Sequence, residues 1–134
     1  MWAKASGHVL QFIDKSDDKW NPVDLDVFVA RGFHGDHEPF DGRGGIVAHS
    51  GYPMEGKVHF DGAEKWTIGG KQGIDFRYVA LHELGHALGL RHSNNPNAIM
   101  HPIYQKTPKD LALTVDDIKG IRYLYKQKVP KRAK

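Results

Sequence analysis

The stretch HELGHALGLRH, at residues 82–92, constrains this chain more than any other part of the sequence. His82 and His86 are four residues apart, so they share one face of a helix and can point both imidazoles at a single metal ion. Gly89 favours the end of that helix because glycine adopts the left-handed C-terminal conformation at little cost, and His92 can then return to the same metal. The remaining face is apolar and carries Leu81, Leu84 and Leu88.

Three neutral imidazoles leave the fourth position of a tetrahedral zinc ion open, which is typical of a catalytic site. Glu83 follows the first ligand and could take a proton from a metal-activated water and pass it to a leaving amine. A single HExxH on a surface helix can be accidental, but here Gly89 and His92 fall in step with it. The sequence therefore predicts a catalytic zinc site with the ligands His82, His86 and His92 and with Glu83 as general base.

The motif followed by Met100 in NNPNAIMHP resembles the zinc helix and methionine turn of the metzincins. The surrounding sequence, from Trp2 to about Tyr125, resembles the matrix metalloproteinase (matrixin) branch. This resemblance implies an α+β (mixed α/β) fold, with a twisted mixed β-sheet packed on a zinc-binding active-site helix and a C-terminal helix. It also implies that Met100 forms a hydrophobic base beneath the zinc ligands, although a methionine there could equally be a flexible core filler.

Length and composition indicate one soluble globular domain, since the 134 residues are 40% hydrophobic and 26% charged. We expect residues 1–125 to form the catalytic domain and the basic tail 126–134 to be disordered. Five positive charges lie in that tail, so the rest of the chain carries about −2 of the total +3 and is not a nucleic-acid surface. No apolar run approaches a membrane span. We expect a monomer.

The chain has no cysteine, so thiols do not indicate a redox compartment. Its first twelve residues lack the apolar core and cleavage site of a secretory signal peptide. An extracellular location is therefore implied by the family resemblance alone.

The first elements predicted are the end of a helix over Trp2–Ser6, a short strand over Val9–Ile13 and a half-buried strand over Asp24–Ala30. Family catalytic domains begin earlier, with a strand and most of a helix ahead of this point. We therefore expect an N-terminally shortened domain in which two neighbouring strands have unpaired backbone groups.

A second zinc site is predicted from His34, Asp36, His49 and His59, the last two on predicted strands. Three imidazoles and a carboxylate complete a tetrahedron, so this zinc would be structural and would stabilise the long loop. Matrixins carry a structural zinc at matching positions. The alternative is a set of dispersed surface histidines, and His37 is left out because the family pattern has no ligand there.

A calcium site is predicted on the glycine-rich loop, because hard carboxylate and carbonyl oxygens suit calcium better than zinc. The alternative is a turn and glycine-rich loop without metal. The predicted ligands are the side chains of Asp41, Asp61 and Glu64 and the carbonyls of Gly42, Gly44 and Ile46.

Substrate binding is expected beside the catalytic zinc. The strand Gly45–Ser50 resembles the family's edge strand, to which an extended peptide adds through backbone bonds from Val47 and Ala48. Tyr78, one turn ahead of the first zinc ligand, could make the neighbouring pocket shallow. The outer wall of that pocket would consist of Pro102, Ile103 and Tyr104.

The last predicted helix, Leu113–Tyr125, has Thr114 as N-cap, with Asp116 and Asp117 at the positive end of its dipole. Its predicted buried stripe is Ile118, Ile121, Leu124 and Tyr125. The resemblance implies that the aspartate pair supports the methionine turn.

Together these features predict a zinc-dependent endopeptidase, with zinc and calcium as cofactors, acting on extended protein substrates of the extracellular-matrix type. One alternative is a truncated, inactive metal-binding fragment. Another is a matrix-binding module, which Glu83 argues against because binding alone needs no general base.

Overall fold

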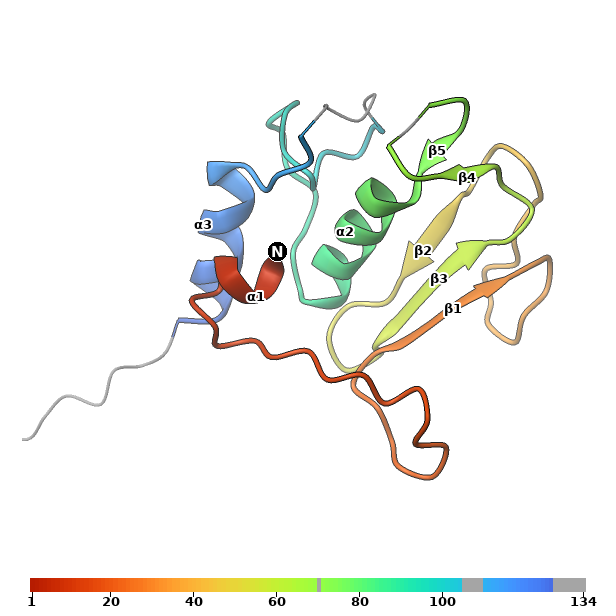
Figure 1. Ribbon diagram of the computed structural model, residues 1–134, viewed down its shortest axis with the longest axis horizontal. Helices are drawn as coiled ribbons and strands as arrows, with labels where there is room; N and C mark the ends of the chain where they lie inside the picture. The colour runs from red at the N-terminus through yellow and green to blue at the C-terminus, as the bar shows by residue number, and fades with distance from the viewer. Residues whose placement is uncertain (70, 105–109, 127–134) are drawn as a thin grey trace, which may run out of the picture.

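A computed structural model describes residues 1–69, 71–104 and 110–126, so most of the predicted tail, residues 127–134, lies outside the described residues. The fold is mixed α+β, as predicted (Figure 1). Within the described ranges, every helix is too short or too polar to serve as a membrane span. The elements in chain order are α1 (Trp2–Ala5), β1 (Asp26–Ala30), β2 (Ala48–Ser50), β3 (Lys57–Asp61), β4 (Trp66–Thr67), β5 (Ile74–Asp75), α2 (Phe76–Ala87) and α3 (Val115–Leu124).

The main sheet is mixed and has the order β1-β3-β2. β1 runs parallel to the central β3, and β2 runs antiparallel to it. Val58 and Phe60 of β3 are buried at 0% and 1% exposure, and period-two alternation sends His59 and Asp61 to the opposite face. The short parallel pair β4 and β5 forms a separate sheet that leads into α2.

Residues 9–13 form no strand, so the strand predicted there is wrong. A strand needs a neighbour to which its backbone is hydrogen-bonded. Among the described strands β1 pairs with β3 alone, so residues 9–13 are not paired with it. Val9, Phe12 and Ile13 of this segment are exposed, with Ile13 at 73%, whereas Leu10 is half-buried and packs against the core. β1 is half-buried as predicted, because Phe28 and Ala30 are partly buried while Val27 and Val29 on the other face are 53% and 59% exposed. Figure 1 shows the segment as an extended chain between α1 and β1.

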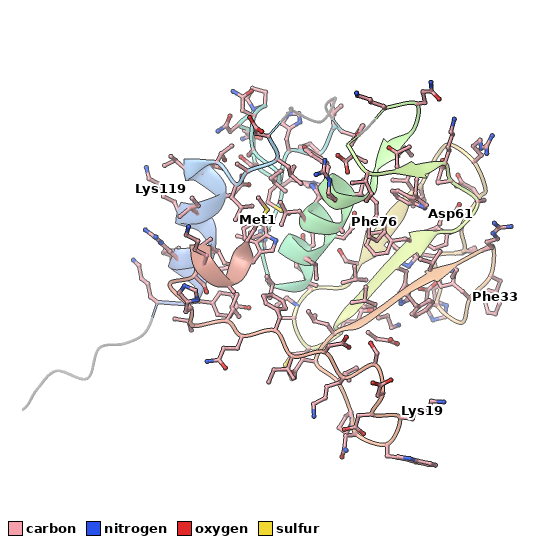
Figure 2. The ribbon with its side chains drawn as sticks, viewed as in Figure 1. Met1, Lys19, Phe33, Asp61, Phe76 and Lys119 are labelled. Atoms are coloured by element: carbon pink, nitrogen blue, oxygen red, sulfur yellow. The ribbon has the colours of Figure 1, made fainter. Side chains whose placement is uncertain are left out.

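Helix α2 lies between the main sheet on one side and α1 with α3 on the other (Figure 1). On the sheet side lies Phe76, which is labelled in Figure 2. The centre of its ring is 4.8 Å from that of Phe60 and 5.5 Å from that of Trp66. On the other side, the indole nitrogen of the buried Trp2 donates to the carbonyl of Leu81 at 3.0 Å. Contacts that involve none of the predicted site residues therefore hold α2 on both sides.

The ends of α2 are set by local chemistry. The Asp75 carboxylate accepts the backbone N–H of Arg77 at 3.0 Å and so caps the N-terminus. At the other end Gly89 has φ 103°, its N–H bonds the His86 carbonyl, and the N–H of Leu90 bonds the Gly85 carbonyl. This is a Schellman ending, and it confirms the predicted role of Gly89.

Helix α3 begins as predicted, with Thr114 and Asp117 forming a reciprocal capping box. Ile121 is fully buried, but Leu124 is 46% exposed, so its predicted place in the buried stripe is wrong. The helix ends at that residue.

Replacing Asp75 with alanine is expected to lower the free energy of unfolding by about 1–2 kcal/mol at pH 7, because α2 loses its cap. Hydrogen bonds from Arg77, opposed by burial, hold the pKa of Asp75 below its usual value. The stabilisation is therefore complete above the unfolded-state pKa of about 3.9 and is lost as the pH falls through the lower folded-state value. Urea unfolding of the wild type and of Asp75→Ala at pH 7, 5 and 3 measures the effect. The difference between their free energies of unfolding should be smaller at pH 3 than at pH 7. An equal difference at all three values would contradict this role.

Candidate metal centres and active site

Three histidines meet at the C-terminal half of α2. His86 Nε2 lies 3.1 Å from His82 Nε2 and 3.1 Å from His92 Nε2. The ligand atoms of all three lie within 4.8 Å of one another. The structure therefore brings together the three predicted ligands of the catalytic zinc.

The hydrogen bonds of these rings fix which nitrogens carry lone pairs. His82 Nδ1 donates to the Ile99 carbonyl at 2.7 Å, and His86 Nδ1 donates to the Leu90 carbonyl at 2.8 Å. Burial lowers the pKa of both histidines, so both are neutral at pH 7 and both Nε2 atoms are unprotonated. Two lone pairs that face each other at 3.1 Å repel unless a cation lies between them. The donors therefore fit a divalent metal, and the carbonyl bonds orient the rings for it.

Glu83 lies on the same helix and is 9% exposed. The hydroxyl of Ser50, from β2, donates to its Oε2 at 2.5 Å. Burial raises the pKa of Glu83, against the effects of Ser50 and His86, and so favours uptake of a proton. The sequence did not predict Ser50 at this site. Its place two residues after Ala48 on the predicted edge strand was the available signal.

Met100 is 2% exposed beneath α2, where the resemblance placed a hydrophobic base. A Cβ at Gly85 would overlap the sulfur of Met100, so this glycine lets the methionine approach the helix. Gly85 is a second residue that the sequence did not identify.

The second cluster joins the loop after β1 to β2 and β3. The donor atoms converge in the manner of a tetrahedral zinc site, whose 2.0–2.1 Å bonds place ligand atoms about 3.3 Å apart. His34 Nδ1 donates to the Gly32 carbonyl at 2.8 Å, and this bond directs its Nε2 toward the cluster. Asp36 Oδ2 is 2.9 Å from His34 Nε2, 3.0 Å from His49 Nε2 and 3.0 Å from His59 Nδ1.

The pKa of Asp36 reflects the close approach of the histidine nitrogens to its carboxylate. Burial opposes its ionisation, but hydrogen bonds from the Glu38 backbone and from His49 and His59 outweigh burial and hold the pKa below its usual range. Asp36 is therefore a carboxylate at neutral pH. His37, which was left out of the site, is exposed.

Two phenylalanines that the sequence did not identify form a wall around this cluster. Phe40 is 5% exposed and stacks on His34 at 4.7 Å and on His49 at 4.8 Å. Phe28 lies 4.0 Å from the His59 ring, its partner in the β1–β3 register. These contacts fix the ring planes and exclude water, so the cluster fits a structural metal better than a catalytic one.

A family model for matrixin matches residues 1–126 of this chain. The chain belongs to the matrixin family. It is 47% identical to matrilysin of Homo sapiens over 119 residues, which cover 86% of this chain and 45% of that protein. It is 50% identical to matrix metalloproteinase-16 of Rattus norvegicus over 109 residues, covering 77% of this chain and 18% of that protein. With matrix metalloproteinase-15 of Homo sapiens the identity is 45% over 134 residues, covering 93% and 20%. The chain therefore spans less than half the length of these relatives.

The calcium site predicted on the glycine-rich loop stays a prediction. The predicted carboxylates accept backbone N–H groups of the same loop: Gly42 donates to Asp61, Gly44 to Glu64 and Ile46 to Asp41. Among the described residues, Asp41, Asp61 and Glu64 are not drawn into one cluster of metal-ligating side chains as the histidines are. A Cβ at Gly45 would overlap the Asp41 carboxylate, so the tight loop needs glycine there.

The predicted substrate strand is shorter than expected, because only Ala48–Ser50 is in β2, but it does lie at the edge of the sheet. The Val47 carbonyl accepts the N–H of Asp61 at 2.9 Å, so it is already used within the protein. Because backbone groups alternate in direction along an antiparallel strand, the groups of Ala48 point away from β3. Ala48, rather than the carbonyl of Val47, can therefore pair with an added strand.

The residues predicted for the pocket separate into two groups. Tyr78 is 5% exposed, and its ring meets that of Tyr104 edge-on at 5.1 Å. The Tyr104 hydroxyl also accepts the N–H of Asp75 at 3.1 Å, which ties this wall to the start of α2. Pro102 and Ile103 are exposed.

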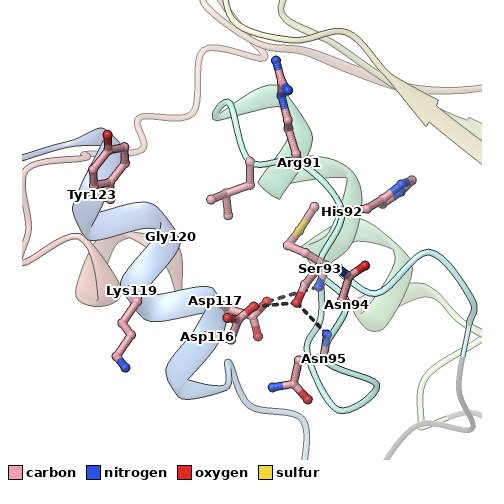
Figure 3. A pocket seen from close by; sticks show the side chains of 12 residues that line it. Arg91, His92, Ser93, Asn94, Asn95, Asp116, Asp117, Lys119, Gly120 and Tyr123 are labelled. Carbon is pink, nitrogen blue, oxygen red and sulfur yellow. Dashed lines mark hydrogen bonds between the residues drawn. The ribbon is translucent and has the colours of Figure 1, made fainter.

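The aspartate pair of α3 has two different roles. Asp117 is 2% exposed and accepts the N–H groups of Ile99 at 3.0 Å and Met100 at 3.1 Å, so it supports the methionine turn. Asp116 is exposed and accepts the hydroxyl of Ser93 at 2.6 Å. Both residues line a hollow of about 640 Å³ between α3 and residues 90–95. Figure 3 shows the two carboxylates at this site.

We expect the purified chain to hold two zinc ions, of which His34→Ala should lose one. The reason is that His34 supplies one of four converging donors, whereas the exposed His37 supplies none. Metal analysis after gel filtration should give about one zinc per chain for His34→Ala and two for the matched control His37→Ala. Two zinc ions in the His34 variant would contradict the four-ligand site.

Proposed function

We propose that this chain is a zinc-dependent endopeptidase that hydrolyses internal peptide bonds of extended protein segments, of the extracellular-matrix type. The observation that carries the proposal is the buried carboxylate of Glu83 next to the converging lone pairs of His82 and His86. Zinc held by His82, His86 and His92 would supply Lewis-acid polarisation of the scissile carbonyl.

Glu83 would act as the general base and then the general acid. Its burial raises its affinity for a proton, and Ser50 occupies Oε2, so Oε1 is the oxygen that can accept a proton from the attacking water. The same oxygen would return the proton to the leaving amine. Proton transfer of this kind contributes about 10²–10⁴-fold to a rate.

The substrate would bind as an added strand along β2. The outward backbone groups of Ala48 support this, because β-strand addition uses the free edge of a sheet. The tyrosine pair Tyr78 and Tyr104 would bound a pocket for an apolar side chain. We further propose that the protein acts outside the cell as a monomer, binds neither nucleic acid nor membrane, and carries calcium on the Asp41 loop.

A second candidate is a non-catalytic metal-binding fragment or matrix-binding module. The exposed valines of β1, Val27 and Val29, favour it, because uncovered apolar side chains are typical of an incomplete surface. The buried Glu83 disfavours it, because a group that only binds has no use for a carboxylate whose ionisation is opposed by burial.

The deciding experiment is hydrolysis of an internally quenched fluorescent peptide with a collagen-like sequence by the chain loaded with zinc and calcium. Turnover that disappears with a zinc chelator and returns with added zinc would support the endopeptidase. A chain that holds two zinc ions, unfolds cooperatively and gives no turnover would refute it and favour the second candidate.

A further inference from the structure

Ser50 connects the two candidate metal centres through one short strand. It follows His49 in β2, and successive side chains of a strand point to opposite faces. His49 enters the four-donor cluster, whereas Ser50 faces α2 and donates its hydroxyl to Glu83 Oε2 at 2.5 Å. The residue that contacts the general base is therefore adjacent to a ligand of the structural centre.

The backbone that carries Ser50 is fixed by its pairing with β3. Ser50 is opposite the fully buried Val58, and His49 is opposite His59, in the β2–β3 register. Because the strand cannot shift without moving two of the converging donors, the hydroxyl has a defined position relative to α2.

We propose that Ser50 is a positioning residue for the general base, an inference that rests on the proposed function. Its hydroxyl fixes Oε2 of Glu83, so that Oε1 points at the attacking water. A carboxylate bound through one oxygen loses the freedom to rotate and exchange its two oxygens, and a hydrogen bond to a charged group is among the stronger ones in proteins. Alanine would leave this buried carboxylate without the donor, whereas threonine would keep the hydroxyl.

The kinetic test compares Ser50→Ala and Ser50→Thr. We expect Ser50→Ala to lower kcat about tenfold with KM and zinc content unchanged, and Ser50→Thr to recover kcat to within about threefold. Ser16→Ala is the matched control, because Ser16 also donates to a carboxylate, Asp14 Oδ1 at 2.6 Å, but on an exposed loop. An unchanged or raised kcat in Ser50→Ala would overturn the proposal. So would a loss of zinc together with kcat, since Ser50 would then be structural.

A double-mutant cycle in unfolding tests the same contact without activity. For Ser50→Ala, Glu83→Ala and the double variant, we expect the double variant's fall in Tm to differ from the sum of the single falls. Additive shifts would overturn the proposal. If the Tm shifts are not additive but the zinc-loaded wild-type chain gives no turnover, the contact is real and the proposed function is wrong. The two failures are therefore distinguishable.

Discussion

Replacing Glu83 with glutamine is expected to lower kcat about 10³-fold and to leave KM within about threefold of the wild-type value. Glutamine keeps the shape of the side chain and can still accept the Ser50 hydroxyl bond, but it cannot take a proton from water. The interaction that is lost is made only in the transition state, so kcat and kcat/KM should fall together. Steady-state kinetics on the quenched peptide measures both values.

Zinc content and stability separate this result from misfolding. We expect two zinc ions per chain and a Tm no lower than wild type, because burial already disfavours the charged form of Glu83. Glu55→Gln is the matched control, since this glutamate is exposed on the loop between β2 and β3 and should be replaced without effect. Turnover of Glu83→Gln within tenfold of wild type would rule out the general-base role.

What could be predicted from the sequence is mostly what depends on local spacing. The pair His82 and His86, the ending at Gly89 and the cap at Thr114 each follow from a few neighbouring residues in a helix. The second cluster was also found, although its donors come from separate elements. Its pattern of three histidines and one aspartate was recognised from the family, and spacing alone would not have joined His34 to His59.

What could not be predicted depends on contacts between distant segments. The bond between Ser50 and Glu83 requires the position of β2 on α2, and the stacking of Phe40 requires the path of the loop after β1. Neither can be read from periodicity. The strand predicted at residues 9–13 was wrong for a related reason. The residue types of a segment indicate that it can form a strand, but its backbone also needs a neighbouring strand with which to form hydrogen bonds.

Replacing Asp117 with asparagine is expected to lower the free energy of unfolding by about 3 kcal/mol, a fall in Tm of roughly 12 °C. The carboxylate is 2% exposed and accepts the N–H groups of Ile99, Met100 and Thr114 and the Thr114 hydroxyl. An amide has one oxygen, and its NH₂ group would face donors. At least one buried N–H would therefore lose its partner. Thermal unfolding of both proteins measures the effect.

The same substitution should weaken zinc binding at a site that Asp117 does not contact. Asp117 bonds the N–H of Ile99, and the carbonyl of Ile99 accepts Nδ1–H of His82, so the carboxylate orients a zinc ligand through one residue. Loss of such outer contacts typically costs 10–100-fold in metal affinity, and we expect about tenfold in a competition titration with a chromophoric chelator. Asp116→Asn, whose side chain is exposed and bonds Ser93, should change Tm by less than about 3 °C and leave zinc affinity unchanged. Equal effects of the two substitutions would show that the charge at the start of α3, rather than the bonds to the methionine turn, is what matters.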